Sequence, residues 1–267
     1  MIIIGELING TRKAVGAAVE AKDADLIQDL ARKQDEAGAS FIDCNAGTPG
    51  DREFGDMEWL VKTVQEVTEK PLAIDSPNPK VVELGLETYT GSATPMINSV
   101  SLEADRIENM LPLAAERKTN VVALAMDDNG VPSLPGQRED IANKLIDACI
   151  EAGLPAGNIY VDPVVTTQSS DANTGPMILQ AIAAIKSHNP EVHVTGGLSN
   201  ISYGLPNRKL LNRAFVTLAM AQGLDSGIID PCDEQLIATI TAAEALLGID
   251  EWCMGYITAS REGKLGE

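Results

Sequence analysis

Short apolar runs and amphipathic segments alternate eight times along this chain, and this alternation restricts its possible folds more than any other feature. Several of the runs are continuously apolar, as expected for parallel strands covered on both faces. Eight such units joined by right-handed crossovers are the number that closes a (β/α)8 TIM barrel. The strand-like runs lie at residues 1–8, 41–47, 71–76, 95–101, 121–126, 159–165, 193–200 and 225–231.

The segments between these runs have the periodicity of helices. Asp23 is placed to cap a helix that runs to Gly38, and Asp233 to cap one that Gly248 closes. In residues 57–67 the apolar positions follow the i, i+3, i+4 rule and share one stripe, with charged residues facing water. Further helices are predicted at residues 79–87, 103–117, 138–152, 176–186 and 208–222.

The number of domains follows from length and continuity. A chain of 267 residues is an ordinary size for one α/β barrel. The alternative, an open doubly wound sheet, calls for a GxGxxG turn after the first strand, where this chain has GELING. No low-complexity linker divides the chain, so we predict a single α/β domain over residues 1–267, in which the segment after Trp252 is a short extension.

The charge balance narrows the class of partner. Lys and Arg number 20 against 39 Asp and Glu, a formal net charge of −19, which repels nucleic-acid phosphates and anionic membranes. No apolar run reaches the length of a membrane span. Residues 1–4 are apolar, but Glu6 interrupts them and no basic segment precedes them, so no signal peptide is read. A cytoplasmic protein is the expectation.

The cysteines and histidines offer little for metal or nucleophilic chemistry. Cys44, Cys149, Cys232 and Cys253 form no CxxC pair, and the chain has only two histidines, at positions 188 and 193. A structural zinc site or a histidine-based triad is therefore not expected.

Oxygen ligands are the remaining route to a metal. Asp75, Asp162 and Asp230 could hold a hard cation, but nothing has the spacing of a calcium loop. We therefore expect no bound metal.

Polar residues gather where the predicted strands end, which is where a TIM barrel carries its active site. This set is rich in carboxylates and amides and poor in cations, which suits a neutral, donor-rich heterocycle better than a phosphate. Gly196 and Gly197 are either a remnant phosphate loop or a place of close backbone approach, and we favour the second. The set is Glu6, Asn9, Asp43, Asn45, Asp75, Asn98, Asp127, Asp162, Ser199, Asn200 and Asp230.

Three of these residues occupy equivalent places. Asp75 in PLAIDS, Asn98 in PMINS and Asp162 in IYVDP each follow a short apolar run. Because an unpaired buried polar group is costly, the three indicate one shared pocket that pairs them. Taken singly, an aspartate after a strand is more often a helix cap or a loop-fixing residue, and that is our interpretation of Asp43, Asp127 and Asp230. Asn200 joins the pocket set, with a turn residue as its alternative.

Longer matches along the chain resemble a known family. They include IIIGELINGTR, FIDCNAG, MEWLVKTVQEV, AIDSPN, MINSVS, YVDPVV, GGLSNISYGLPNR and LLNRAFVTLAMAQGLDSGIIDPCDE, and they cover nearly the whole length in the family's order. The chain is similar to the pterin-binding TIM barrels and, among these, to the methyltetrahydrofolate–corrinoid protein methyltransferases. The nearest types are the acetogenic corrinoid/iron–sulfur protein methyltransferase and the tetrahydrofolate methyltransferases of glycine betaine-type demethylation.

The resemblance implies roles for individual residues. Asp75, Asn98 and Asp162 match the positions that hydrogen-bond the pterin ring, where carboxylates accept from N–H groups and an amide serves a mixed edge. Asn200 matches the residue near N5, where the methyl group of 5-methyltetrahydrofolate sits. An asparagine can donate a hydrogen bond there, with the proton arriving through water and Asp75 or Asp162. Catalytic roles are thus implied for Asn200, Asp75 and Asp162.

The resemblance also implies partners. The corrinoid-binding signature DxHxxG is absent, so the cobalamin is expected on a separate corrinoid protein that docks over the barrel mouth. Arg208 is placed to bind the folate tail or that partner. Tyr203 stands where the acetogenic enzymes carry glutamine, so no proton-relay role is assigned there. The family implies a homodimer.

Three other functions compete. A dihydropteroate synthase would carry a Ser-Arg-Lys tripeptide after the seventh strand and Arg-x-His at the eighth, where this chain has GGLSN and IIDPCD. A non-catalytic folate-binding protein would share the pterin pocket but would have no use for Asn200 at N5. A sugar-phosphate isomerase or aldolase would want a lysine or glutamate at a strand end with a phosphate loop, and no strand-end lysine is found.

Overall fold

Eight parallel strands form one sheet in the computed structural model, which describes residues 1–266. Neighbouring strands follow the order β7-β6-β5-β4-β3-β2-β1-β8, and a bridge from Gly197 to Ile228 joins the two ends. The predicted (β/α)8 TIM barrel is confirmed. The strands are β1 (Ile2–Gly5), β2 (Phe41–Cys44), β3 (Leu72–Asp75), β4 (Met96–Ser101), β5 (Asn120–Leu124), β6 (Ile159–Asp162), β7 (His193–Val194) and β8 (Ser226–Ile229).

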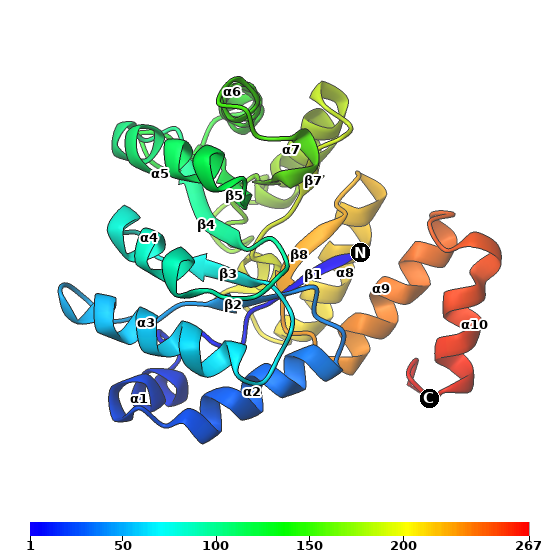
Figure 1. The fold of residues 1–267 in the computed structure, drawn as a ribbon. Coiled ribbons are helices and arrows are strands. Elements are labelled where there is room, and N and C mark those ends of the chain that lie inside the picture. Colours follow the sequence, from blue (N-terminus) through cyan, green and yellow to red (C-terminus); the bar gives the residue numbers. More distant parts are fainter. Residues whose placement is uncertain (267) are drawn as a thin grey trace.

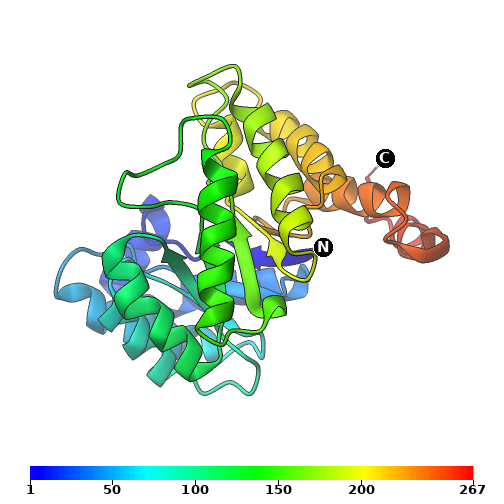
Figure 2. The same ribbon diagram turned by 90° about the horizontal axis from the view of Figure 1, so that it is seen from above.

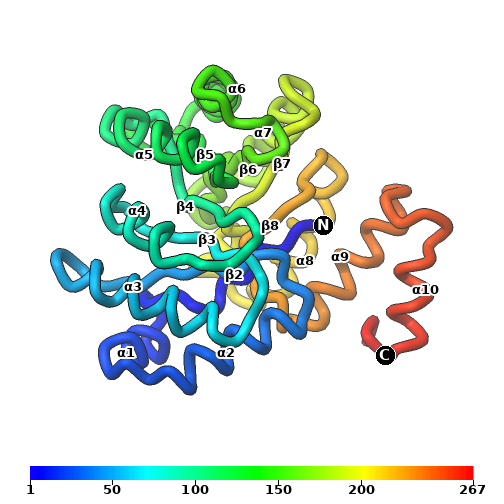
Figure 3. The backbone as a smooth tube through the Cα atoms, in the orientation of Figure 1, coloured from blue at the N-terminus to red at the C-terminus, as the bar shows by residue number. Residues whose placement is uncertain are grey.

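Helices surround the strands (Figures 1 and 3). Asp23 accepts a hydrogen bond from Leu26 N–H and Asp233 from Leu236 N–H, so both predicted helix caps are confirmed. The α-helices are α1 (Lys13–Ala21), α2 (Ala24–Glu36), α3 (Arg52–Gln65), α4 (Pro79–Thr88), α5 (Ala104–Arg117), α6 (Gln137–Glu151), α7 (Thr174–His188), α8 (Arg208–Ala221), α9 (Glu234–Leu246) and α10 (Met254–Arg261). Three 3-10 turns are η1 (Ala156–Asn158), η2 (Leu198–Ser202) and η3 (Glu251–Cys253).

Two segments differ from the prediction. Helix α1 precedes α2 and buries Val15, Ala18 and Val19, although the sequence indicated a single helix between the first two strands. The seventh run, expected as a strand over 193–200, pairs only at His193–Val194 and then turns into η2. Two glycines, Gly196 and Gly197, weaken a strand at this point because they bring no side chain to pack. Asn200 consequently lies on a 3-10 turn at the barrel rim.

The barrel interior has an apolar floor with a polar layer above it. The floor consists of Ile4, Phe41, Ala73, Met96, Val122 and Tyr160, all buried. Side chains two residues apart on a strand share a face, so the next inward positions carry the polar layer. Phe41 is followed by Asp43, Ala73 by Asp75, Met96 by Asn98 and Tyr160 by Asp162. The larger core lies between the strands and the helices.

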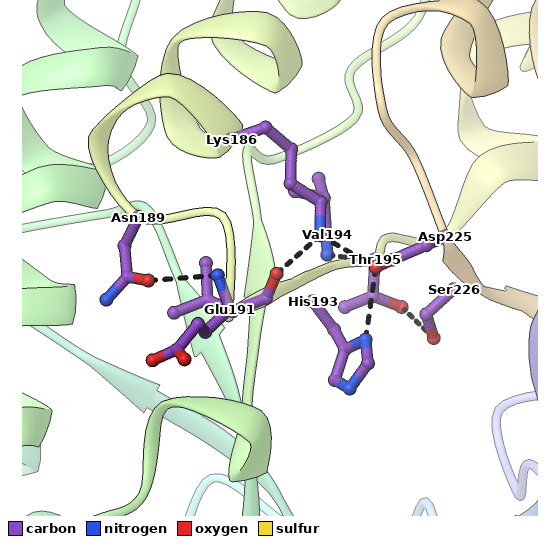
Figure 4. Close-up of polar contacts among 9 residues, drawn as sticks. Lys186, Asn189, Glu191, His193, Val194, Thr195, Asp225 and Ser226 are labelled. Atoms are coloured by element: carbon purple, nitrogen blue, oxygen red, sulfur yellow. Dashed lines mark hydrogen bonds and ion pairs between the residues drawn. The ribbon is translucent and has the colours of Figure 1, made fainter.

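A second polar cluster lies at the opposite end of the barrel, where β7 and β8 begin (Figure 4). Asp225 accepts hydrogen bonds from Val194 N–H at 2.8 Å, Lys186 Nζ at 2.7 Å and the His193 ring at 3.1 Å. His193 stacks on Tyr160, with 4.6 Å between ring centroids. This cluster ties the short strand β7 to the start of β8, away from the polar layer at the barrel mouth.

The last helix stands outside the barrel. Helix α10 contacts α9 and η3, and it projects away from the strands in two perpendicular views (Figures 1 and 2). None of its described residues, Met254–Arg261, is buried. Across residues 1–266 the structure contains no helix with both the length and the apolar character needed to cross a bilayer.

Candidate active site

The polar layer at the barrel mouth brings together the residues that the sequence singled out. Asp75 ends β3, Asn98 lies in β4 and Asp162 ends β6, and Asp75 pairs in register with Asn98. Glu6 follows β1 and Asp43 lies in β2. These residues come from β1 to β4 and from β6 of one parallel barrel, and the carboxyl ends of its strands meet at one mouth.

Two amides pair with two carboxylates in this layer. Asn45 Nδ2 donates to Asp75 Oδ2 at 2.7 Å, and Asn98 Nδ2 donates to Asp43 Oδ1 at 3.1 Å. Each amide has thereby used one donor on a carboxylate, which fixes the orientation of its plane. The side-chain oxygen of Asn98 remains as an acceptor, and so does the second carboxylate oxygen of Asp75. A ligand with a mixed hydrogen-bonding edge can use both.

Burial shifts the ionisation of these carboxylates. It raises the pKa of Asp75 to about 6, against the opposing hydrogen bond from Asn45. Burial, together with the nearby charge of Asp75, raises the pKa of Asp43 well above its usual range. The pKa of Glu6 is also raised by burial, with Arg12 opposing it through an ion pair of 2.6 Å. Burial and the neighbouring charge therefore disfavour the ionised form of Asp43, and Asp75, with a pKa of about 6, can gain or lose a proton near neutral pH.

Asp162 is held by backbone N–H groups. Its side chain is buried, and Oδ1 accepts from Val164 N–H at 2.8 Å. The backbone N–H groups of Val165 and Gly197 also favour the ionised carboxylate and lower its pKa. Burial raises the pKa of Asp162 to about 6 in spite of these bonds. A Cβ at Gly196 would lie 3.1 Å from Oδ1, so the glycine lets β7 approach this carboxylate.

Asn200 stands at the rim on η2, with its side chain exposed. Arg208 braces this turn from the start of α8: its Nη2 donates to the Ser199 carbonyl at 2.7 Å and its Nε to Ser202 Oγ at 3.0 Å. The two contacts lie on either side of Asn200 in the sequence. Tyr203 follows the turn and is 68% exposed, with its ring 5.9 Å from the Arg208 guanidinium carbon.

A side cavity of about 480 Å³ opens beside this turn. Its charged lining is mixed, because Arg12 pairs with Glu6 and Lys209 with Asp233 at 3.1 Å. Arg208 reaches this cavity as well as bracing η2. The sequence predicted a ligand contact for Arg208, and the structure adds a bracing contact that the sequence did not indicate.

One interpretation from the sequence was wrong. Asp43 is not a cap or a loop residue: it points into the barrel beneath Asp75 and binds Asn98. The signal that would have found it is its place two residues after Phe41, on the same inward face. Asp127 and Asp230 do fix loops, since each accepts the N–H two residues on, at 2.9 Å from Asn129 and from Cys232.

Two further kinds of site were considered from the sequence: a metal-binding cluster and reactive cysteines. Within residues 1–266, no three His, Cys, Asp or Glu side chains gather in a group that could hold a metal ion. Cys44 and Cys149 are buried, whereas Cys232 and Cys253 are exposed.

Comparison with known proteins gives a consistent family. The family model described as "Pterin binding enzyme" matches residues 5–230. A methylcorrinoid:tetrahydrofolate methyltransferase of Eubacterium limosum is 37% identical over the whole of this chain and 98% of its own length. The methionine synthase of Mycobacterium tuberculosis is 31% identical over 86% of this chain, which corresponds to 20% of that longer protein.

Solved structures show the same fold. A dihydropteroate synthase of Yersinia pestis in complex with a sulfonamide drug superposes with a TM-score of 0.70 at 14% identity, covering 93% of this chain and 94% of that one. The enzyme of Xanthomonas albilineans in complex with 7,8-dihydropteroate gives a TM-score of 0.62 at 20% identity, over 94% and 93% of the two chains. At these identities the likeness concerns the barrel alone. The family match and the full-length relative show that this chain belongs to the pterin-binding enzymes, alongside the methylcorrinoid:tetrahydrofolate methyltransferases.

Proposed function

We propose that this enzyme transfers a methyl group between N5 of tetrahydrofolate and the cobalt of a separate corrinoid protein. The observation that carries the proposal is the layer of Asp75, Asn98 and Asp162 at the mouth of the barrel. The full-length similarity to a methylcorrinoid:tetrahydrofolate methyltransferase supports the same reaction.

The three residues fit the edge of a pterin. Its ring N–H and amino groups are donors, and the ionised carboxylates of Asp75 and Asp162 offer acceptors to them. Asn98 is fixed by Asp43, so its free carbonyl and remaining N–H meet the mixed part of the edge. A ring without these groups leaves buried polar atoms unpaired, and such sites discriminate by roughly 10⁴-fold or more. This pairing sets specificity for the pterin.

Methyl transfer needs help at N5. In the direction from folate, the N5–CH₃ bond breaks, the methyl group passes to cobalt, and the N5 lone pair takes up a proton. Asn200 is exposed at the rim, so its amide can donate a hydrogen bond to N5 as that lone pair develops. The proton arrives from solvent through water, and the carboxylate of Asp75 or Asp162 can relay it, because pKa values of about 6 permit exchange near neutral pH. In the reverse direction, N5 attacks the methyl group.

The corrinoid belongs to a partner in this proposal. The chain has no DxHxxG sequence to bind cobalamin, so the corrinoid protein docks over the mouth and brings its cobalt to N5. Arg208 lines the side cavity next to the mouth and is proposed to meet the anionic tail of folate there. The proposal also treats residues 1–267 as one barrel domain. In it, the reaction uses no metal bound by this chain, and the protein acts in the cytoplasm.

We also propose that two copies of this chain associate through α9, η3 and α10. Apolar side chains are exposed along this segment: Leu246, Leu247, Ile249, Trp252, Met254, Tyr256 and Ile257. We call this set the C-terminal apolar patch. The side chains are between 36% and 86% exposed, and a contiguous exposed apolar patch on a monomer marks an interaction site. Only Asp250 and Glu251 carry charge between residues 246 and 257, so two copies with net charge −19 can meet here with little repulsion.

A spectrophotometric assay tests the reaction. The protein should convert free cob(I)alamin and 5-methyltetrahydrofolate to methylcobalamin, and the reverse, with EDTA present. A chelator-sensitive affinity for folate would contradict the metal-free part of the proposal. Absence of transfer in both directions, with formation of dihydropteroate from its precursors, would instead identify a dihydropteroate synthase.

Variants of Asn200 test the step at N5. Both Asn200→Ala and the isosteric Asn200→Asp remove the amide donor, and both should slow transfer by about 10- to 100-fold, the worth of one hydrogen bond to a charged group. Folate affinity, measured by calorimetry, should change much less. A variant with wild-type turnover removes Asn200 from the mechanism.

A further inference from the structure

Arg138, in the first turn of α6, is an arginine in an unusual place. Arg138 is only 3% exposed, although an arginine is rarely buried unless it is paired with a carboxylate. Nε donates to the Pro163 carbonyl at 3.0 Å and Nη2 to Thr166 Oγ1 at 3.4 Å. Among residues 1–266, Nη1 has no partner. A buried cation with an unmet N–H costs stability, so stability alone does not explain an arginine here.

Both hydrogen bonds end in the loop that follows β6. That loop contains Val164, whose φ of +61° lies in the left-handed region. A β-branched residue there stores about 1–3 kcal/mol of strain and stays there only if its surroundings hold it. Val164 N–H donates to Asp162 Oδ1 at 2.8 Å, and the preceding carbonyl, that of Pro163, accepts from Arg138. The strained residue is therefore held between the site carboxylate and the buried guanidinium.

We propose that Arg138 is a positioning residue for the pterin site: its bond to the Pro163 carbonyl holds the Asp162–Val164 turn so that the Asp162 carboxylate faces the mouth, and its charge favours the ionised carboxylate. The inference rests on the proposed function, since it concerns the acceptor offered to the pterin. It extends that function to a residue that touches neither the substrate nor the reacting atoms.

The charges around Asp162 support this role. Burial raises the pKa of Asp162, whereas the backbone N–H groups of Val164, Gly197 and Val165 and the positive charge of Arg138 lower it. The groups that face Asp162 from the packed elements are Val164 and Val165 of its own loop, Gly197 after β7, and Arg138 of α6. Arg138 is the only full charge among these, so its removal leaves burial less opposed and moves the ionisation of Asp162 to higher pH.

The experiment measures the Kd of tetrahydrofolate for the whole protein between pH 5 and 8. Arg138→Met removes both the hydrogen bond and the charge, and it should weaken binding about 10-fold at pH 7 and shift the fall in affinity to higher pH. Arg138→Lys keeps the charge and should keep the wild-type pH profile. Thr166→Val removes only the long 3.4 Å contact and should leave both the affinity and the profile unchanged.

A double-mutant cycle asks whether Arg138 acts through Asp162. In an Asp162→Asn background, Arg138→Met should have little further effect on Kd, because the carboxylate it serves is gone. The inference is overturned if folded Arg138→Met has wild-type affinity and pH profile, or if its loss is the same in both backgrounds. Should Arg138→Met fail to fold, Arg138→Gln, a neutral donor, takes its place, and an unshifted profile overturns the inference.

The outcomes also separate this inference from the proposed function. Wild-type protein that does not bind tetrahydrofolate defeats the proposed function itself. Wild-type protein that binds, with Asp75→Asn binding weakly and Arg138→Met binding normally, defeats only the role of Arg138.

Discussion

Buried carboxylates are the residues in which function and stability conflict most clearly. Asp162 is buried with its pKa raised to about 6, above the ordinary value near 3.9, so folding makes its ionisation harder. A group of this kind binds more protons in the folded than in the unfolded state between these two values. Its cost to the folded protein therefore grows as the pH rises from about 4 to 6 and is fully present above that range.

Asp162→Asn should accordingly stabilise the protein while weakening its site. At pH 7.5 the neutral amide avoids the ionisation cost, and the free energy of unfolding should rise by about 2–3 kcal/mol, the equivalent of a shift of two pKa units. At pH 4, Asp162 is protonated in the folded protein and about half protonated in the unfolded chain, so most of this advantage should disappear. Urea unfolding at the two pH values measures the free energy of unfolding. Equal stability of the variant and the wild type at pH 7.5 would contradict the raised pKa of Asp162.

The proposed function predicts that folate binding depends on pH through Asp75 and Asp162. In that proposal both carboxylates are ionised to accept from the pterin, and burial raises the pKa of each to about 6. Tetrahydrofolate affinity should therefore be constant above pH 7 and fall by about 10-fold or more per unit below pH 6. Calorimetric titration across this range checks the profile. Asp75→Asn should weaken binding at pH 7.5 and make the remaining fall less steep, whereas an unchanged affinity would contradict the pocket assignment.

At the scale of elements, the strands and their polar ends were largely predictable. The apolar runs were long enough to mark all eight strands, and the positions of Asp75, Asn98 and Asp162 after such runs predicted that they lie at the mouth. A period of two counted from Phe41 would also have placed Asp43, which was instead treated as a single loop residue. The predicted range of strand β7 was too long, because Val194 and its neighbours are typical of a strand, whereas the pairing ends before Gly196 and Gly197.

Other features of the site depend on contacts that no local pattern contains. Arg138 reaches a carbonyl 25 residues away, and nothing in its own helical segment marks it as buried. The brace from Arg208 to Ser199 depends on how η2 folds back against α8. The left-handed Val164 is equally hidden, since a valine is among the residues least expected there. These features depend on tertiary contacts, which local sequence propensities do not predict.

The short strand β7 depends on Asp225. This side chain accepts from Val194 N–H, Lys186 and His193. Burial alone would raise its pKa, but the hydrogen bonds from His193 and Lys186 bring the pKa below its ordinary value. The stability that Asp225 contributes is thus present above pH 4 and is lost as the pH falls through its folded-state pKa.

Asp225→Ala should destabilise the barrel without touching its chemistry. Losing the shared acceptor leaves Val194 N–H unpaired and removes the ion pair of Lys186, which keeps only its hydrogen bond to the Val192 carbonyl. This loss costs about 1–3 kcal/mol, and tetrahydrofolate affinity at the other end of the barrel should remain as in the wild type. Asp147→Ala is the matched control, because it removes only an exposed contact to His188 and should cost under about 0.5 kcal/mol. Thermal unfolding of both variants at pH 7.5 measures the difference. Equal melting temperatures would contradict the stabilising role of Asp225 between β7 and β8.

The whole molecule combines a strongly acidic chain with one apolar side. Electrostatic repulsion between copies favours the monomer, so any association must bring apolar area together where charge is sparse. The C-terminal apolar patch meets that condition. The segment that carries it, from the end of α9 through α10, lies away from the strands (Figures 1 and 2). Helix α10 has no buried residue among those described, so an eight-residue helix in this position gains little from its own chain.

A charge placed in the patch should therefore separate the copies. The double variant Leu246→Glu, Trp252→Glu puts two carboxylates on side chains that are 86% and 83% exposed, so the isolated barrel should fold as before. Sedimentation equilibrium should give twice the chain mass for the wild type and a single chain mass for the variant, because each buried interface would have to desolvate four new charges. Leu134→Glu, at a leucine 66% exposed outside the patch, should leave the dimer intact. A wild-type monomer, or a double variant that still dimerises, would show that the patch does not join two copies. Tetrahydrofolate affinity should be the same in all three proteins, because neither α9 nor α10 contributes a side chain to the polar layer at the mouth.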